Sequence, residues 1–245
     1  MTSFTGAHVW IIGASSGIGR ALSIRLAREG ARLTLSARNR DALEDVRRTL
    51  NGPHTVVPVD VTDFDLLHKA VSGMTSLDSV IFLAGQYEPG QLGDSNAAAS
   101  KAIVETNLTG ALNTLHAVLP VMHRQGRGQI ALCASVAGYR GLPNGQPYSA
   151  TKAAIINLAE SLKTEEAKNG IDIRLISPGF VKTPMTDKNA FPMPMMISPE
   201  QAADAIAAGL QGRDFEIHFP RRMTWIMKIL QILPYRLYFK IAGRL

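Results

Sequence analysis

Three polar side chains have a spacing that suits proton transfer to or from a carbonyl oxygen. Ser135 is followed thirteen residues later by Tyr148, and Lys152 comes four residues after the tyrosine. A helical pattern follows, so a helix that includes Tyr148 places the phenol and the ammonium one turn apart on one face. A neighbouring ammonium favours the phenolate, so we expect the pKa of Tyr148 to lie below about 10. Such a phenol is an acid/base catalyst, and Ser135 can hold the substrate oxygen. The alternative is a surface tyrosine and lysine at chance spacing.

A glycine-rich turn near the N-terminus is typical of a dinucleotide site. The apolar run at residues 7–12 predicts a strand, and an amphipathic helical pattern follows the turn through Arg28. Between them, Gly13 permits a tight turn, Gly17 lets the backbone approach a pyrophosphate, and Gly19 allows the helix to pack closely. The pyrophosphate charge is favoured at the helix N-terminus. A purely structural turn is the alternative.

The end of the second predicted strand, at residues 31–35, indicates which dinucleotide binds. An NAD site commonly has an acidic residue there for the ribose 2′-hydroxyl, but this chain has no acid before Asp41. Arg38 stands there instead, and a guanidinium pairs well with a 2′-phosphate. We therefore expect NADP(H) rather than NAD(H), unless Arg38 merely opens the next predicted helix at residues 41–50.

Strand and helix patterns alternate along the rest of the chain. We expect further strands at residues 55–59, 79–83, 129–134, 171–176 and 215–219, and long helices at 97–123 and 148–168. This alternation predicts one α/β domain with a parallel, doubly wound sheet, in which ligands bind beyond the carboxyl ends of the strands. Several candidate residues fall at those ends: Gly13, Arg38, Asp60, Gly85, Ser135 and Pro178. Asn107 is a poor residue for a helix interior, which suggests a function for it.

These motifs together resemble those of the short-chain dehydrogenase/reductases. The matched positions are residues 13–19, Asp60 and Val61, Ala84 and Gly85, Asn107, Ser135, Tyr148 to Lys152, and Pro178 to Thr183. The resemblance covers at least residues 7–183 and implies a Rossmann-fold, NAD(P)-dependent oxidoreductase that forms dimers or tetramers. It also implies a catalytic tetrad of Asn107, Ser135, Tyr148 and Lys152.

The resemblance assigns a role to each member of the tetrad. Tyr148 is the acid/base, Lys152 lowers its pKa and binds the nicotinamide ribose, Ser135 orients the substrate oxygen, and Asn107 supports a water that links Lys152 to solvent. Asp60 and Val61 meet the adenine, while Val181 and Thr183 meet the nicotinamide amide. The implied cofactor contacts are Gly13, Ser15, Ser16, Gly17, Ile18, Gly19, Arg38, Asp60, Val61, Ala84, Gly85, Asn107, Tyr148, Lys152, Pro178, Gly179, Val181 and Thr183.

The chain departs from the usual family pattern at two places. Ile12 stands where the family usually has threonine, and Phe82-Leu83 replaces an Asn-Asn pair. These changes are apolar and lie at strand ends, so we expect them to be absorbed without loss of cofactor binding. Some NADP enzymes of the family carry a basic residue where this chain has Ser16, so the preference for NADP(H) depends mostly on Arg38.

Residues 183–197 contain four methionines and three prolines, and in the family this region covers the substrate. Because methionine adapts to irregular apolar shapes, we expect a lid over a hydrophobic ketone or alcohol, with plain packing as the alternative. Cys133 lies in an apolar run, which favours a buried, inert thiol over a reactive one. One cysteine and no secretory signal at residues 2–8 favour a cytoplasmic protein. We expect no metal site.

The net charge of +6 is confined to the C-terminal part of the 245-residue chain. Residues 221–245 contain six basic side chains and no acid, while basic and acidic side chains balance elsewhere. A nucleic-acid groove on the body is therefore not expected. Lys228 and Pro234 interrupt the apolar pattern, so no span of about 20 apolar residues exists. We expect an oxidoreductase domain at 1–220 and an amphipathic tail at 221–245. Through residues 222–245 this tail either lies on a membrane or packs on a dimer partner or the body.

The sequence therefore predicts an NADP(H)-dependent enzyme that transfers hydride between the nicotinamide and an apolar, lipid-like carbonyl or alcohol. Two rival functions stay open. One is a dinucleotide-sensing scaffold on the same fold, and the other is a peripheral membrane adaptor that acts through the tail.

Overall fold

The computed structural model describes residues 3–74 and 76–243 and contains one parallel sheet. Within these residues, seven strands are arranged in the order β3-β2-β1-β4-β5-β6-β7. The strands are β1 (His8–Ile12), β2 (Arg32–Ser36), β3 (Thr55–Val56), β4 (Ser79–Phe82), β5 (Gly128–Cys133), β6 (Ile171–Pro178) and β7 (Glu216–Phe219). The predicted doubly wound sheet is confirmed. The edge strand β3 is shorter than the expected 55–59, although the amides of Val57 and Val59 still donate to the Leu35 and Ala37 carbonyls at 3.0 and 3.1 Å.

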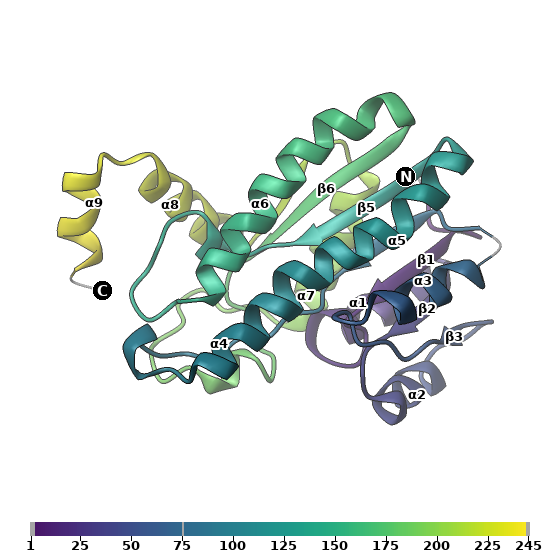
Figure 1. Cartoon of the computed structure of the whole chain (residues 1–245), viewed down its shortest axis with the longest axis horizontal. Coiled ribbons are helices and arrows are strands. Elements are labelled where there is room, and N and C mark those ends of the chain that lie inside the picture. Colours follow the sequence, from purple (N-terminus) through teal and green to yellow (C-terminus); the bar gives the residue numbers. More distant parts are fainter. Residues whose placement is uncertain (1–2, 75, 244–245) are drawn as a thin grey trace.

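Helices cover both faces of the sheet (Figure 1). They are α1 (Gly17–Arg28), α2 (Arg40–Arg48), α3 (Phe64–Ser72), α4 (Ala97–Val104), α5 (Gly110–Gln125), α6 (Tyr148–Glu165) and α7 (Pro199–Gln211). Alternate residues of each strand face opposite sides. Trp10 and Ile12 pack with α3, α5 and α6, whereas Val9 and Ile11 pack with α1, α2 and α7. Burial on both faces explains why the strands read as continuous apolar runs.

The helix expected at residues 97–123 is interrupted. A π-helical segment, Glu105–Thr109, separates α4 from α5 and contains the fully buried Asn107. Such segments are rare and often occur at functional sites. The irregular hydrogen bonding here explains how a residue that disfavours helix interiors is accommodated.

Two helices follow β7 and extend to one side of the sheet, where they are yellow in Figure 1. They are α8 (Arg221–Ile232) and α9 (Tyr235–Ala242), and Pro234 ends the first and caps the second. Among the described residues, no helix has the length and apolar character needed to cross a bilayer.

Candidate active site

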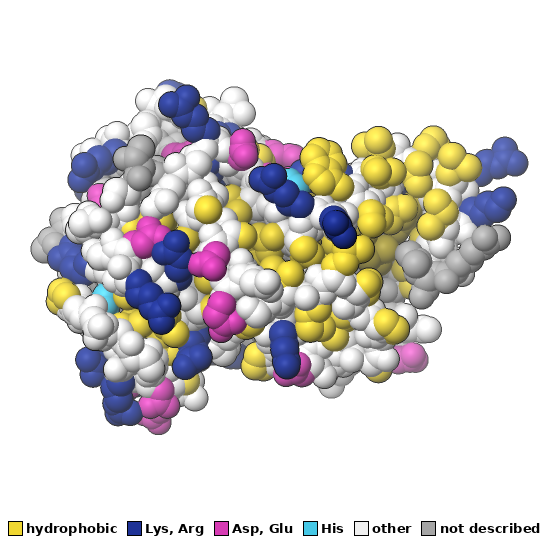
Figure 2. Space-filling view, turned by 180° about the vertical axis from the view of Figure 1, so that it is seen from behind, with side chains coloured by type: hydrophobic (Ala, Val, Ile, Leu, Met, Phe, Trp, Pro, Cys, Tyr) yellow, Lys and Arg dark blue, Asp and Glu magenta, His cyan; other side chains and the backbone are white. Residues whose placement is uncertain are grey.

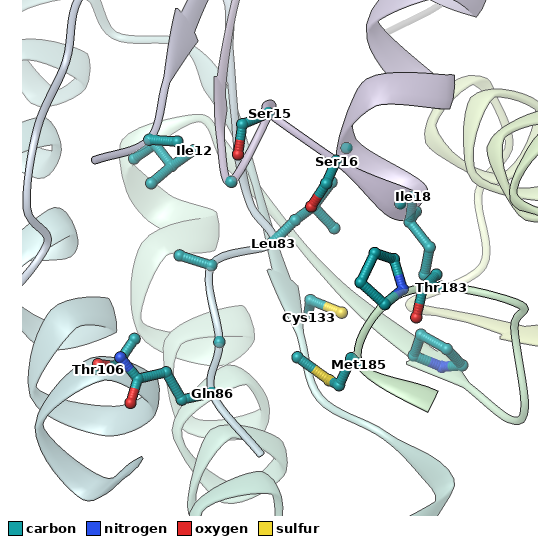
Figure 3. Close-up of a pocket in the computed structure, with 18 of the residues that line it drawn as sticks. Ile12, Ser15, Ser16, Ile18, Leu83, Gln86, Thr106, Cys133, Thr183 and Met185 are labelled. Atoms are coloured by element: carbon teal, nitrogen blue, oxygen red, sulfur yellow. The ribbon is translucent and has the colours of Figure 1, made fainter. Parts of the chain in front are cut away.

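A cleft of about 380 Å³ lies at the carboxyl ends of the strands. Its wall contains every predicted cofactor contact except Asn107, together with Ser135. Parallel strands end at one edge of a sheet, which brings these distant segments together. Figure 3 shows Ser15, Ser16 and Ile18 from the turn after β1, with Thr183 and Met185 from the segment beyond β6.

The glycine-rich turn is tightly packed against its neighbours. Gly13 has φ of +96°, and a Cβ there would lie 2.7 Å from the backbone nitrogen of Ala84. A Cβ at Gly19 would overlap the carbonyl oxygen of Gly13, so α1 can approach the turn only with glycine at this position. The first turn of α1 contains no acidic residue. Its free N–H groups therefore provide a favourable place for an anion at the cleft wall.

Arg38 and Asp60 lie at the β2 side of the cleft. Arg38 is exposed, and no carboxylate among the described residues is within ion-pair distance of it. The Asp60 carboxylate accepts hydrogen bonds from the Thr62 backbone at 3.0 Å and the Thr62 hydroxyl at 2.8 Å. Burial opposes its ionisation, but these hydrogen bonds and the charge of Arg38 outweigh burial and lower the pKa of Asp60. The exposed guanidinium of Arg38 and the hydrogen-bonded carboxylate of Asp60 thus lie on the same side of the cleft.

Ser135, Tyr148 and Lys152 all line the cleft. The helix α6 begins at Tyr148, so Lys152 lies one turn later, as expected. The ammonium of Lys152 donates to the Cys133 carbonyl at 2.8 Å and lies 5.4 Å from the centroid of the Tyr148 ring. The Ser135 hydroxyl donates to the Pro178 carbonyl at 3.4 Å and accepts from the Ala137 amide at 3.2 Å. A phenol, an ammonium and a hydroxyl thus share one site.

The structure corrects the expected direction of the Tyr148 pKa. Burial raises the pKa of Tyr148 above its ordinary value, although the Ser135 hydroxyl acts in the opposite direction. Burial also lowers the pKa of Lys152. The expectation was wrong because it considered only the ammonium, whereas burial of the phenol is the largest effect on its pKa. The phenol is therefore in its protonated form at neutral pH, which is the form that a general acid needs.

Asn107 lies behind the cleft wall rather than in it. Its side-chain oxygen accepts from the Gln86 amide at 2.7 Å. Its side-chain nitrogen donates to the Gln86 carbonyl at 3.0 Å and to the Thr151 hydroxyl at 3.1 Å. Asn107 thus joins the segment after β4 to α6, and it fixes both of them beside Lys152.

The predicted lid at residues 183–197 is pinned at both of its ends. Val181 and Ile197 form an isolated β-bridge, and the Lys182 amide donates to the Ile197 carbonyl at 2.9 Å. The Tyr87 hydroxyl donates to the Asn189 side chain at 2.8 Å, which ties the lid to the segment after β4. Of the four lid methionines, all of which the structure describes, only Met185 lines the cleft.

Sequence reasoning did not single out several residues of this site. Gln86 and Thr106 line the cleft, and each is next in the chain to a predicted residue, Gly85 and Asn107 respectively. Tyr87 packs edge-on against Tyr148 with ring centroids 5.0 Å apart, and nothing in the spacing indicated this contact. Cys133 is buried, and burial raises the pKa of its thiol, in agreement with the inert interpretation.

A doubly wound parallel sheet with a ligand cleft at the carboxyl ends of its strands defines a Rossmann-type fold. Residues 7–192 match the family model described as short chain dehydrogenase, and the chain belongs to that family. A protein described as an uncharacterized oxidoreductase of Myxococcus xanthus (strain DK1622) is 35% identical over 96% of both chains. One from Mycobacterium tuberculosis (strain CDC 1551 / Oshkosh) is 30% identical over 99% of this chain and all of its own. A short chain dehydrogenase from Burkholderia cenocepacia J2315, solved in complex with NADP, superimposes with a TM-score of 0.87 at 24% identity, covering 97% and 98% of the two chains.

Proposed function

We propose that this protein is an NADP(H)-dependent reductase of apolar carbonyl compounds and that Tyr148 is its proton donor. The observation that carries the proposal is the convergence of Tyr148, Ser135 and Lys152 in the cleft that also contains the N-terminus of α1. A proton donor and an anion-binding helix end in one cleft suit hydride chemistry with a phosphate-bearing cofactor.

The cleft residues fit NADP. The N-terminal N–H groups of α1 would hold the pyrophosphate, and the exposed guanidinium of Arg38 would bind the 2′-phosphate. Asp60 and Val61 would contact the adenine, while Val181 and Thr183 would contact the nicotinamide amide. The NADP complex of the structurally similar Burkholderia protein supports this choice. When bound, the cofactor supplies or accepts the hydride.

The chain supplies the proton and the orientation of the substrate. The phenol of Tyr148 donates its proton to the carbonyl oxygen, which the Ser135 hydroxyl holds in place. Lys152 stabilises the negative charge that then develops on Tyr148, since its ammonium is next to the ring. Asn107 keeps the Gln86 segment and α6 in register around these groups. Because burial raises the pKa of Tyr148, its phenol carries the proton that reduction requires at neutral pH.

The substrate side of the cleft favours an apolar molecule. Met185 lies in the cleft wall, and Tyr87 packs against Tyr148 beneath the pinned lid. Flexible thioethers and aromatic rings accommodate hydrophobic ketones of irregular shape, including keto-lipids.

The test is a spectrophotometric assay of NADPH oxidation against a panel of aliphatic, aromatic and long-chain ketones. We expect turnover with apolar members and a loss of about 10²–10⁴-fold in Tyr148→Phe, because the proton donor is removed. Tyr235→Phe, on the exposed surface of the tail, is the matched control and should keep full activity. Tight NADPH binding without turnover of any compound would instead favour the dinucleotide-sensing scaffold. The homodimer or tetramer expected from the family stays a prediction, which sedimentation velocity would test.

A further inference from the structure

We propose that the outward face of α8 and α9 binds the surface of a membrane that contains anionic lipid. This face, called the tail face below, is formed by the exposed apolar and basic side chains of the two helices. Figure 2 shows the hydrophobic side chains gathered at this end of the molecule, with lysine and arginine side chains beside them. The binding is independent of the proposed reductase chemistry.

The helix α8 has large apolar side chains on its outward side as well as on the side that packs against the body. Its buried residues, Thr224 and Met227, face the body. The opposite side bears Trp225, Ile226, Ile229 and Ile232, which are between 50% and 80% exposed. An amphipathic surface helix normally turns its polar side to water. An exposed group of large apolar side chains of this kind marks a binding surface.

The shorter helix α9 also exposes large apolar side chains. Tyr238 and Ala242 are buried against the body. Tyr235, Leu237, Phe239 and Ile241 are exposed, and the rings of Tyr235 and Phe239 stack with centroids 5.7 Å apart. Aromatic and aliphatic side chains next to basic ones are typical of helices that lie in a membrane interface.

The charge of the tail face determines which partner it fits. Arg236 and Lys240 are exposed one turn apart on α9, where like charges repel each other. No carboxylate among the described residues is within ion-pair distance of either of them, or of Arg221 and Arg222. A second copy of this chain docked face to face would bring two such positive sets together. Anionic headgroups would instead neutralise them while the apolar side chains enter the lipid.

The tail face is held in a fixed position relative to the cleft. The guanidinium of Arg140 lies between the rings of Tyr235 and Tyr238, 4.5 and 4.4 Å from their centroids. It also donates to the Gln231 carbonyl at 2.6 Å, and Lys228 pairs with Glu216 at 2.6 Å. Arg140 belongs to the segment between Ser135 and Tyr148, so a membrane bound at the tail face is close to the active-site segment.

Sedimentation of the full chain with lipid vesicles tests the proposal. We expect the protein to pellet with vesicles of phosphatidylcholine mixed with phosphatidylglycerol, and to pellet much less with phosphatidylcholine alone. Raising the salt concentration should weaken the binding, because screening reduces the attraction of the basic side chains to the headgroups.

Two pairs of variants separate the apolar and the basic contributions. Trp225→Ser with Ile229→Ser should weaken vesicle binding by more than about tenfold, since both side chains enter the lipid. Arg236→Gln with Lys240→Gln should weaken it by about fivefold for each charge removed. Each pair has a control at exposed sites on the body. The control for the apolar pair is Phe64→Ser with Leu66→Ser. The control for the basic pair is Arg28→Gln with Lys69→Gln. These two controls should bind as the wild type does.

Three results would overturn the proposal. The first is equal pelleting with neutral and anionic vesicles, and the second is wild-type binding by the tail-face variants. The third is a dimer that Trp225→Ser with Ile229→Ser converts to monomer in sedimentation velocity, in a protein that does not bind vesicles. That result would assign the tail face to a second copy of the chain.

Discussion

Basic side chains in the cleft and in the tail differ in their burial and in their contacts, as Lys152 on the one hand and Arg236 and Lys240 on the other illustrate. In the cleft, Lys152 is buried, bonds to the Cys133 carbonyl and lies beside the Tyr148 ring. In the tail, Arg236 and Lys240 are exposed among apolar side chains and have no acidic partner among the described residues. A buried cation that is held by contacts within the protein has a fixed position, as catalysis requires. Exposed cations beside apolar side chains are available to an external partner such as a membrane.

The largest expected effect is at the buried cation. Lys152→Ala should lower kcat for NADPH-dependent reduction by about 10²-fold or more, because no cation then stabilises the charge on Tyr148. Steady-state kinetics with a reactive ketone measure this loss. Lys168→Ala, at an exposed position after α6, is the control and should leave kcat unchanged. Equal rates for wild type and Lys152→Ala would contradict the role of the ammonium.

Arg38 lines the cleft but is exposed like the basic side chains of the tail. It is therefore a cleft cation that is available to a ligand, the 2′-phosphate of the cofactor. Arg38→Asp should shift the preference for NADPH over NADH by about tenfold to hundredfold toward NADH, since a charged hydrogen-bonding partner of the 2′-phosphate is lost. The ratio of kcat/KM for the two cofactors measures the shift. Arg40→Asp makes the same change outside the cleft wall and should leave the ratio near the wild-type value. An equal loss for both cofactors in Arg38→Asp would argue against 2′-phosphate binding.

The smallest expected effect is at Arg140, which connects the two regions. Arg140→Ala removes the cation between Tyr235 and Tyr238 and should lower the free energy of unfolding by about 1–2 kcal/mol. Urea denaturation measures the change, with Arg222→Ala as the exposed control on α8. If Arg140→Ala lowers the free energy of unfolding no more than Arg222→Ala does, the contacts of Arg140 with the two tyrosine rings do not stabilise the fold.

Much of the cleft could be predicted because its geometry follows from topology. Once the strands are known to be parallel, Gly13, Asp60, Gly85 and Ser135 must fall at one edge of the sheet. The turn between Gly13 and Gly19 could be predicted too, because its local backbone demands those residues.

Other features depend on tertiary contacts that spacing does not contain. The direction of the Tyr148 pKa shift depends mainly on how deeply the folded chain buries the phenol. The position of Asn107 depends on a π-helical segment that no sequence pattern indicated. In the tail, the amphipathic pattern predicted helices, but it did not reveal which side would face the body.

The pH dependence of kcat/KM for NADPH-dependent reduction tests the proton-donor role of Tyr148 most directly. Because burial raises the pKa of Tyr148, the acid form persists through neutral and mildly alkaline pH. For reduction by the wild type, kcat/KM should therefore not fall through deprotonation of Tyr148 below about pH 10. For the reverse oxidation, which needs the phenolate, kcat/KM should rise with pH. Tyr148→Phe should be slower at every pH and should lack this dependence. A wild-type rate of reduction in Tyr148→Phe across the same range would contradict the account.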